Sequence, residues 1–132
     1  MNCAVRYYSR SGNTKALAEA IAKGAGTDAV SVDASGAELT EKTDILFVGG
    51  ALYAYGIDKH LKKWLSGLDG LQVGKAVVFS TSWLSKHSLD LIRKALEEKG
   101  IKVAQETIYY KNMPTDSQLK EAEKNAERLA NS

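Results

Sequence analysis

The stretch Cys3-Ala4-Val5-Arg6-Tyr7-Tyr8-Ser9-Arg10-Ser11-Gly12-Asn13-Thr14 decides the fold. Its first half is rich in β-branched and aromatic residues and predicts a strand over residues 3–8. Its second half is small and polar, and a helical stripe follows at once with Leu17, Ala18, Ile21 and Ala22. We expect this helix to end at Lys23-Gly24, where glycine suits a left-handed cap. A strand, a short loop and a helix in direct succession predict the first unit of an α/β fold.

Four more strands are predicted, over residues 29–33, 45–49, 76–81 and roughly 103–109. Two of them contain continuous apolar runs, which is typical of central parallel strands that are covered on both faces. Amphipathic helical segments separate most of the strands, whereas residues 34–42 leave room for only a small helix. Thr115 and Gln118 form a capping-box pattern that begins the last helix. The sequence therefore predicts a five-stranded parallel sheet with helices on both faces, a three-layer α/β sandwich.

Length and composition limit the possible functions. The 132 residues fit one domain, residues 1–132, and the net charge of +2 does not indicate a nucleic-acid surface. No apolar run has membrane-spanning length and no signal peptide is recognisable, so we expect a cytoplasmic protein without a membrane span. Cys3 is the only cysteine, and we expect it to be a small core residue. His60 and His87 lack metal-ligand companions; we expect both at the surface and predict no metal site.

The polar loop after the first strand is a candidate phosphate site. A helix N-terminus presents unpaired backbone N–H groups and the positive end of the helix dipole. The hydroxyl groups of Ser9, Ser11 and Thr14 add neutral donors. The loop lacks the G-x-x-x-x-G-K-S/T pattern of nucleoside triphosphate sites and the G-x-G-x-x-G pattern of dinucleotide sites. A phosphate monoester is the ligand that these features favour.

The loop resembles that of the flavodoxin family, whose phosphate loop has the form S/T-x-S/T-G-x-T after the first strand. The resemblance extends over essentially the whole chain, because the other strands and loops follow in the expected order. It implies strand order 2-1-3-4-5, with non-covalent flavin mononucleotide (FMN) at the switch point between strands one and three. It also implies oxidised, semiquinone and hydroquinone forms of the flavin. The expected phosphate-binding residues are Ser9, Arg10, Ser11, Gly12, Asn13 and Thr14.

Two further loops at the same edge of the sheet are expected to hold the flavin ring. They contribute Ala51, Leu52, Tyr53, Ala54, Tyr55 and Gly56 after the third strand, and Thr81, Ser82 and Trp83 after the fourth. Tyr53 or Tyr55 can stack on the ring, and Trp83 is the expected second wall. The family often places a glycine near the ring's N5, directly after the stacking aromatic. If Tyr53 stacks, Ala54 occupies that position, disfavours a positive φ and weakens stabilisation of the semiquinone.

The resemblance implies an electron carrier between redox partner proteins, a reductase and an acceptor, and such a role requires no catalytic residue or metal. Two alternatives stay open. One is a small FMN-dependent oxidoreductase of quinone or protoporphyrinogen type, acting on an anionic or quinone substrate; the other is a flavodoxin-shaped interaction module without flavin.

Two features depart from the family pattern. Lys59, His60, Lys62 and Lys63 form either a solvated helix face or a surface that attracts an acidic partner or an anionic substrate. Arg6 lies inside the first strand, where the family has an apolar residue. We expect Arg6 to be paired with an acidic residue such as Asp33 or Glu106.

Overall fold

A five-stranded parallel sheet forms the centre of the computed structural model, which describes residues 2–53, 56–81 and 86–131. Its strand order is β2-β1-β3-β6-β7, which is the predicted order 2-1-3-4-5 when the strands of this sheet are counted alone. A separate antiparallel pair of two-residue strands follows β3. The strands are β1 (Cys3–Tyr8), β2 (Ala29–Ser31), β3 (Thr43–Gly50), β4 (Leu52–Tyr53), β5 (Gly56–Ile57), β6 (Val73–Ser80) and β7 (Ile108–Tyr109).

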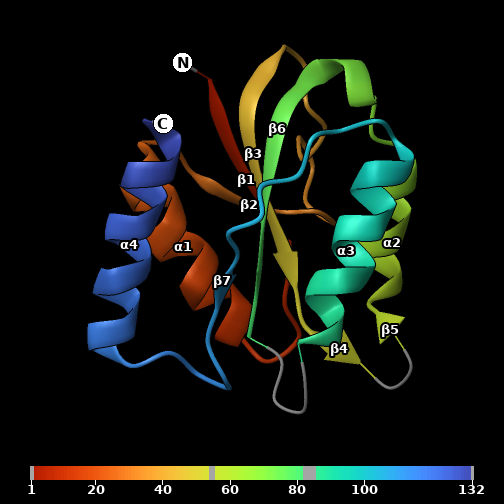
Figure 1. The fold of residues 1–132 in the computed structure, drawn as a ribbon. Helices are drawn as coiled ribbons and strands as arrows, with labels where there is room; N and C mark the ends of the chain where they lie inside the picture. The colour runs from red at the N-terminus through yellow and green to blue at the C-terminus, as the bar shows by residue number, and fades with distance from the viewer. Residues whose placement is uncertain (1, 54–55, 82–85, 132) are drawn as a thin grey trace.

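Helices cover both faces of the sheet (Figure 1). One face carries α1 (Asn13–Ala25) and α4 (Asp116–Ala130), and the other carries α2 (Lys59–Ser66) and α3 (His87–Glu98). A 3₁₀ turn, η1 (Gly70–Gln72), precedes β6. The predicted three-layer α/β sandwich is confirmed. The fifth predicted strand is shorter than expected, because β7 has two residues and only a single bridge joins Val103 to Ala76.

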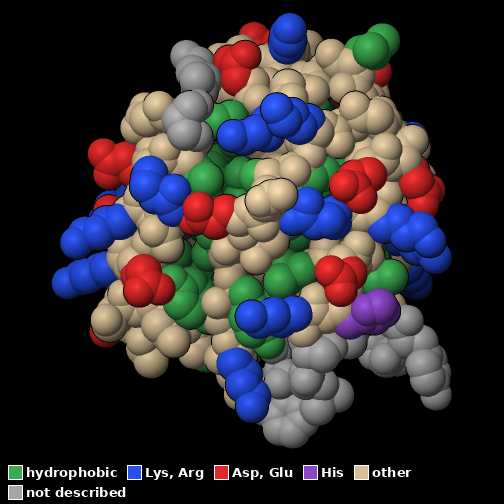
Figure 2. All heavy atoms as spheres, in the orientation of Figure 1, with side chains coloured by type: hydrophobic (Ala, Val, Ile, Leu, Met, Phe, Trp, Pro, Cys, Tyr) green, Lys and Arg blue, Asp and Glu red, His purple; other side chains and the backbone are tan. Residues whose placement is uncertain are grey.

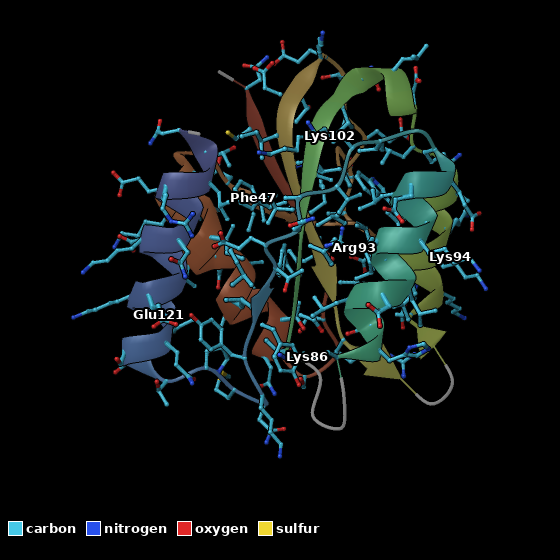
Figure 3. The ribbon with its side chains drawn as sticks, in the orientation of Figure 1. Phe47, Lys86, Arg93, Lys94, Lys102 and Glu121 are labelled. Carbon is cyan, nitrogen blue, oxygen red and sulfur yellow. The ribbon has the colours of Figure 1, made fainter. Side chains whose placement is uncertain are left out.

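Each face of the sheet packs into its own apolar cluster. Phe47, Val77 and Phe79 lie in the cluster between the sheet and helices α1 and α4, and Figure 3 shows Phe47 in that layer. Leu46 and Val48 point to the opposite face, toward α2 and α3. Neighbouring residues alternate between faces because side chains along a strand point to opposite sides. Since both faces are covered, the central strands have continuous apolar sequences, as the sequence predicted.

The helix ends confirm one sequence prediction and correct another. The capping box of Thr115 and Gln118 is present, and Gly100, which follows α3, has the left-handed φ of 77°. Gly24, in contrast, lies inside α1, and the left-handed cap is Gly26 with φ of 75°. A Cβ at Gly24 would lie 2.0 Å from the backbone oxygen of Glu123 in α4. Position 24 therefore requires a residue without a side chain, because α1 and α4 are in contact there.

Arg6 does not have the predicted acidic partner. Its Nε donates to the backbone oxygen of Ala37 at 2.6 Å, and one terminal nitrogen donates to that of Val5 at 3.1 Å. The Trp64 Nε1 donates to the same Ala37 oxygen at 3.2 Å. These bonds attach the polar segment 34–42, which contains no helix, to the sheet and to α2. The two acidic residues expected to pair with Arg6 have other partners: Glu106 forms an ion pair with Arg128, and Asp33 accepts a hydrogen bond from the Ser31 hydroxyl.

The direction of the strands places the connecting loops. β1, β3 and β6 all end at the lower edge of the sheet in Figure 1, so the strand ends lie side by side there. The start of β1 and the end of α4 lie at the upper edge. In the part of the chain that the structure describes, no helix has the length and apolar character that a membrane span requires.

Candidate functional site

The carboxyl edge of the sheet brings the three predicted loops together. In the register of the sheet Tyr8 is opposite Gly50 and Gly49 is opposite Phe79, so the ends of β1, β3 and β6 are nearly level. The loop between β1 and α1, the segment after β3 and the start of the segment after β6 therefore share one edge. Ligands of open parallel α/β sheets bind in this position.

The loop between β1 and α1 is a turn around Gly12, which has φ of 92°. A non-glycine residue pays a steric penalty at this φ, and no heavy atom lies within 4 Å of the position that a Cβ would take. The Gly12 N–H donates to Ser9 Oγ at 2.9 Å and the Asn13 N–H to Ser11 Oγ at 3.4 Å. No side chain caps α1, and its first turn contains no acidic residue. The loop can therefore offer backbone donors to an external anion.

A buried hydroxyl pair joins this loop to the one after β6. Thr14 Oγ1 and Thr81 Oγ1 are 2.7 Å apart, and both side chains are buried. A second buried hydroxyl pair joins the end of β6 to α3: Ser80 Oγ lies 2.7 Å from Ser88 Oγ. In the Thr pair one hydroxyl donates to the other, which leaves the accepting hydroxyl with a hydrogen for a further acceptor. Thr14 and Thr81, predicted from separate parts of the sequence, thus lie in one site.

Arg10 binds Asp58, an interaction that the sequence analysis missed. The Nε and one terminal nitrogen of Arg10 both donate to Asp58 Oδ2, at 2.9 and 2.7 Å. The Asp58 side chain is only 3% exposed, whereas that of Arg10 is 55% exposed. Asp58 also caps α2, because its Oδ1 accepts from the His60 backbone N–H at 2.7 Å. The ion pair fastens the loop after β1 to the start of α2.

His60 completes this cluster instead of being a simple surface residue. Its Nδ1 lies 2.8 Å from Asp58 Oδ1, and its ring stacks on Tyr8 with centroids 4.6 Å apart and planes 12° from parallel. An Asp directly before an amphipathic helix was a recognisable capping signal for Asp58. The Tyr8 and His60 contact had no comparable signal, because the two residues are far apart in the chain.

The environment of Asp58 keeps its carboxylate ionised. Burial by itself raises the pKa of Asp58, but the hydrogen bonds from His60 and from Arg10, together with the charge of Arg10, outweigh burial. The net effect is a pKa below the ordinary value. Because Asp58 carries its charge opposite Arg10, the cluster adds little net charge to the phosphate loop.

The segment after β3 begins with two glycines that are required by packing. A Cβ at Gly49 would lie 2.4 Å from the ring and the backbone oxygen of Phe79, and one at Gly50 would lie 2.6 Å from Leu61. Ala51 is half-buried, and Leu52 and Tyr53 form β4, whose antiparallel partner contains Gly56. Gly56 has open space at the position of a Cβ. Of the other predicted ring contacts, Ala54, Tyr55, Ser82 and Trp83 lie outside the described residues.

A charged residue, Lys86, precedes α3. Lys86 lies at the lower edge, with its Nζ 5.3 Å from the centre of the Tyr109 ring (Figure 3). This geometry is a cation–π contact between the start of α3 and β7. Within residues 2–53, 56–81 and 86–131, no three His, Cys, Asp or Glu side chains are grouped as metal ligands.

Comparisons with known proteins agree with this fold. A family model described as a flavodoxin domain matches residues 4–124. A flavodoxin from the domain Archaea superposes with a TM-score of 0.84 at 26% identity, covering 99% of this chain and 97% of that one. Oxidised Flavodoxin 1 from Bacillus cereus has a TM-score of 0.81 at 19% identity, with 99% and 98% coverage. No match was found among curated proteins.

A larger protein contains the same fold as one of its parts. The rubredoxin oxygen:oxidoreductase from Desulfovibrio gigas superposes with a TM-score of 0.83 at 19% identity, covering 98% of this chain but 35% of that one. The parallel sheet, with its loops gathered at the carboxyl edge, defines a flavodoxin-like α/β protein. The match over residues 4–124 goes further, and the chain belongs to the flavodoxin family. Membership in this family supports a flavin-binding, electron-transfer role.

Proposed function

We propose that the protein binds FMN non-covalently at the carboxyl edge of its sheet and carries electrons between redox partner proteins. The observation that carries the proposal is the start of α1, where Gly12 turns the loop and no side chain caps the helix. By comparison α2 is capped by Asp58 and α4 by Thr115. Apart from the Asn13 N–H, which Ser11 Oγ accepts, the first turn of α1 therefore keeps its backbone donors for a ligand at the predicted phosphate position.

The chemistry of the loop suits the phosphate of FMN. Ser9 and Ser11 accept backbone N–H groups through their oxygens, so their hydroxyl hydrogens can be donated to a phosphate. The Thr14 and Thr81 pair has one further hydroxyl hydrogen available. Arg10 is held by Asp58, so neutral donors and the dipole of α1 supply most of the attraction. In the proposal, Ser9, Arg10, Ser11, Gly12, Asn13 and Thr14 together form the phosphate site.

The flavin ring is proposed to lie between the segments that follow β3 and β6. Ala51, Leu52, Gly56 and Thr81 are described at this edge, and Tyr53 or Tyr55 and Trp83 are the proposed aromatic walls. FMN supplies the one- and two-electron chemistry when it is bound. The chain holds the phosphate, excludes water with its apolar segments and sets the electrostatic environment of the ring. Electron transfer of this kind needs no general base from the protein.

Replacement of Gly12 tests the phosphate site directly. Gly12→Ala forces an L residue into a left-handed conformation, which costs about 1–2 kcal/mol and reshapes the loop. We expect the purified wild-type protein to retain a flavin absorption band after FMN addition and desalting, and the variant to lose it.

Gly26→Ala is the matched control for this experiment. Gly26 has φ of 75° and open space at the other end of the same helix. The control should be destabilised to a similar extent in urea unfolding but should retain FMN. Equal loss of FMN in both variants would assign the effect to helix strain, and no retained flavin in the wild-type protein at any FMN concentration would reject the proposal.

A further inference from the structure

Helix α2 presents a surface that is basic throughout. Lys59, Lys62 and Lys63 are exposed, while Leu61 and Leu65 on the same helix are buried. The helix contains no acidic residue, and among the described residues none of the three lysines has an ion-pair partner. Elsewhere charges of both signs are mixed: Figure 2 shows acidic and basic side chains interspersed over α4 and α3. The surface of α2 therefore differs in kind from its neighbours.

The dipole of α2 favours Lys63, in the last turn of the helix, but it does not explain Lys59. Lys59 lies in the first turn, where the positive end of the helix dipole disfavours a cation, and the Asp58 carboxylate that caps this turn is already bound to Arg10. Lys59 is also spaced three and four residues from Lys62 and Lys63, the spacings at which like charges on a helix repel. An external group of negative charge would relieve both effects.

A hollow lies next to these lysines, between α2 and α3. Its volume is about 400 Å³, and its lining includes the apolar side chains of Ile57, Leu65, Leu91 and Ala95. Charged residues also line it: Lys62 from α2, and Glu98 and Lys99 from the end of α3. The lining also includes Gly56, which follows Tyr55, a proposed wall of the ring site. An apolar centre with a charged rim is the usual arrangement of a protein–protein interface.

We propose that this surface, made of Lys59, Lys62, Lys63 and the adjoining hollow, docks an acidic redox partner protein. The inference rests on the proposed function, because it names the partner class of the same electron carrier. Carboxylates of the partner would meet the lysines, and one of its apolar side chains would enter the hollow. A partner bound there would reach Gly56 and the edge of the ring site. Its association is steered by charge and weakens as ionic strength rises.

The experiment uses NMR titrations of the ¹⁵N-labelled protein with two probes. An acidic plant-type two-iron ferredoxin represents the partner class, and basic mitochondrial cytochrome c is the charge control. Each titration is made at about 0.01 M and about 0.1 M ionic strength, where the Debye length falls from 30 Å to 10 Å. It is done first without FMN and then with FMN. We expect saturable shifts from ferredoxin that centre on α2 and weaken with salt, and none there from cytochrome c.

Two charge-reversal variants locate the interface. Lys59→Glu/Lys63→Glu should weaken ferredoxin binding roughly tenfold or more. Lys120→Glu/Lys124→Glu on α4 should leave it nearly unchanged, although both variants change the formal net charge from +2 to −2. Both pairs are exposed and lie four residues apart on a helix. A glutamate is favoured at position 59, in the first turn of α2, and disfavoured at position 63, in its last turn, so the two effects oppose each other. Thermal unfolding of both variants checks that weaker binding does not reflect misfolding.

The outcomes separate this inference from the proposed function. Docking on α2 without retained FMN would reject only the cofactor proposal. Retained FMN without docking, docking elsewhere, or equal effects of the two variants would reject the inference. Equal binding of an oligonucleotide on the same lysines would also reject it, because the surface would then attract any polyanion.

Discussion

At the scale of single residues, Asp58 has the most connected side chain of the candidate site. It is buried, accepts two hydrogen bonds from Arg10 and caps α2 through the His60 backbone. It thus joins the proposed phosphate loop to the helix that follows the proposed ring loop. The sequence could predict the loop residues, because their pattern is local. It could not predict the partners of Arg10 or Arg6, which depend on which distant segments meet at the sheet.

Asp58→Asn should lower the free energy of unfolding at neutral pH by about 1–3 kcal/mol, because the bonds to Arg10 lose their charged acceptor. The pKa of Asp58 in the folded protein lies below its ordinary value of 3.8. The stabilisation that the Asp58 charge provides is therefore complete above pH 3.8 and is lost as the pH falls through the pKa of the folded protein. The difference between variant and wild type should shrink below about pH 4 in denaturant unfolding measured across this range.

Asp69→Asn provides the comparison for this prediction. Asp69 caps η1 by accepting the Leu71 N–H at 3.0 Å, and it is exposed. Its replacement should change stability little. A difference between Asp58→Asn and wild type that stays constant down to pH 3 would contradict the role of the Asp58 charge.

At the scale of elements, the apolar periodicity predicted each strand of the main sheet and each of the four α-helices. The short antiparallel pair β4 and β5 was not predicted, because two-residue strands have no periodicity to detect. The misplaced cap at Gly24 has a related cause. A glycine near the end of a helix has the same sequence signal whether it turns the chain or makes room for a neighbour. Only the position of α4 separates the two roles.

Gly24→Ala should destabilise the protein by about 1–3 kcal/mol, despite the better helix propensity of alanine. The new Cβ would lie 2.0 Å from the Glu123 backbone oxygen, so α1 and α4 must move apart. Urea unfolding measures the loss. Gly67→Ala, at the end of α2, is the control, since its nearest atoms are 3.8 Å away and its φ of −89° suits any residue. Similar losses in both variants would disprove a packing role for Gly24.

At the scale of the whole molecule, the candidate site joins the two apolar layers. The phosphate loop leads into α1 on one face, and the segment after β3 leads into α2 on the other. The two-sided burial of the central strands allowed the sheet and its layers to be anticipated from sequence. The basic surface of α2 was visible in the sequence too, but the hollow beside it depends on how α2 and α3 pack.

A ligand bound at this junction should stabilise the whole fold. FMN at a hundredfold excess over its Kd adds about 2.7 kcal/mol, which for a chain of this size raises the Tm by roughly 10 °C. Differential scanning fluorimetry or calorimetry measures the shift. Riboflavin, which lacks the phosphate, should give a much smaller shift, and Gly12→Ala should remove most of the FMN effect. An equal shift from both flavins would argue against the phosphate site.

The start of β1 and the end of α4 lie at the edge of the sheet opposite to the candidate site (Figure 1). A tether attached at either end would therefore leave the candidate site facing away from the support. Immobilised on a sensor surface, the molecules would share one orientation, with the proposed flavin edge toward the solution. Such a film would present the same edge to every dissolved redox protein that reaches it.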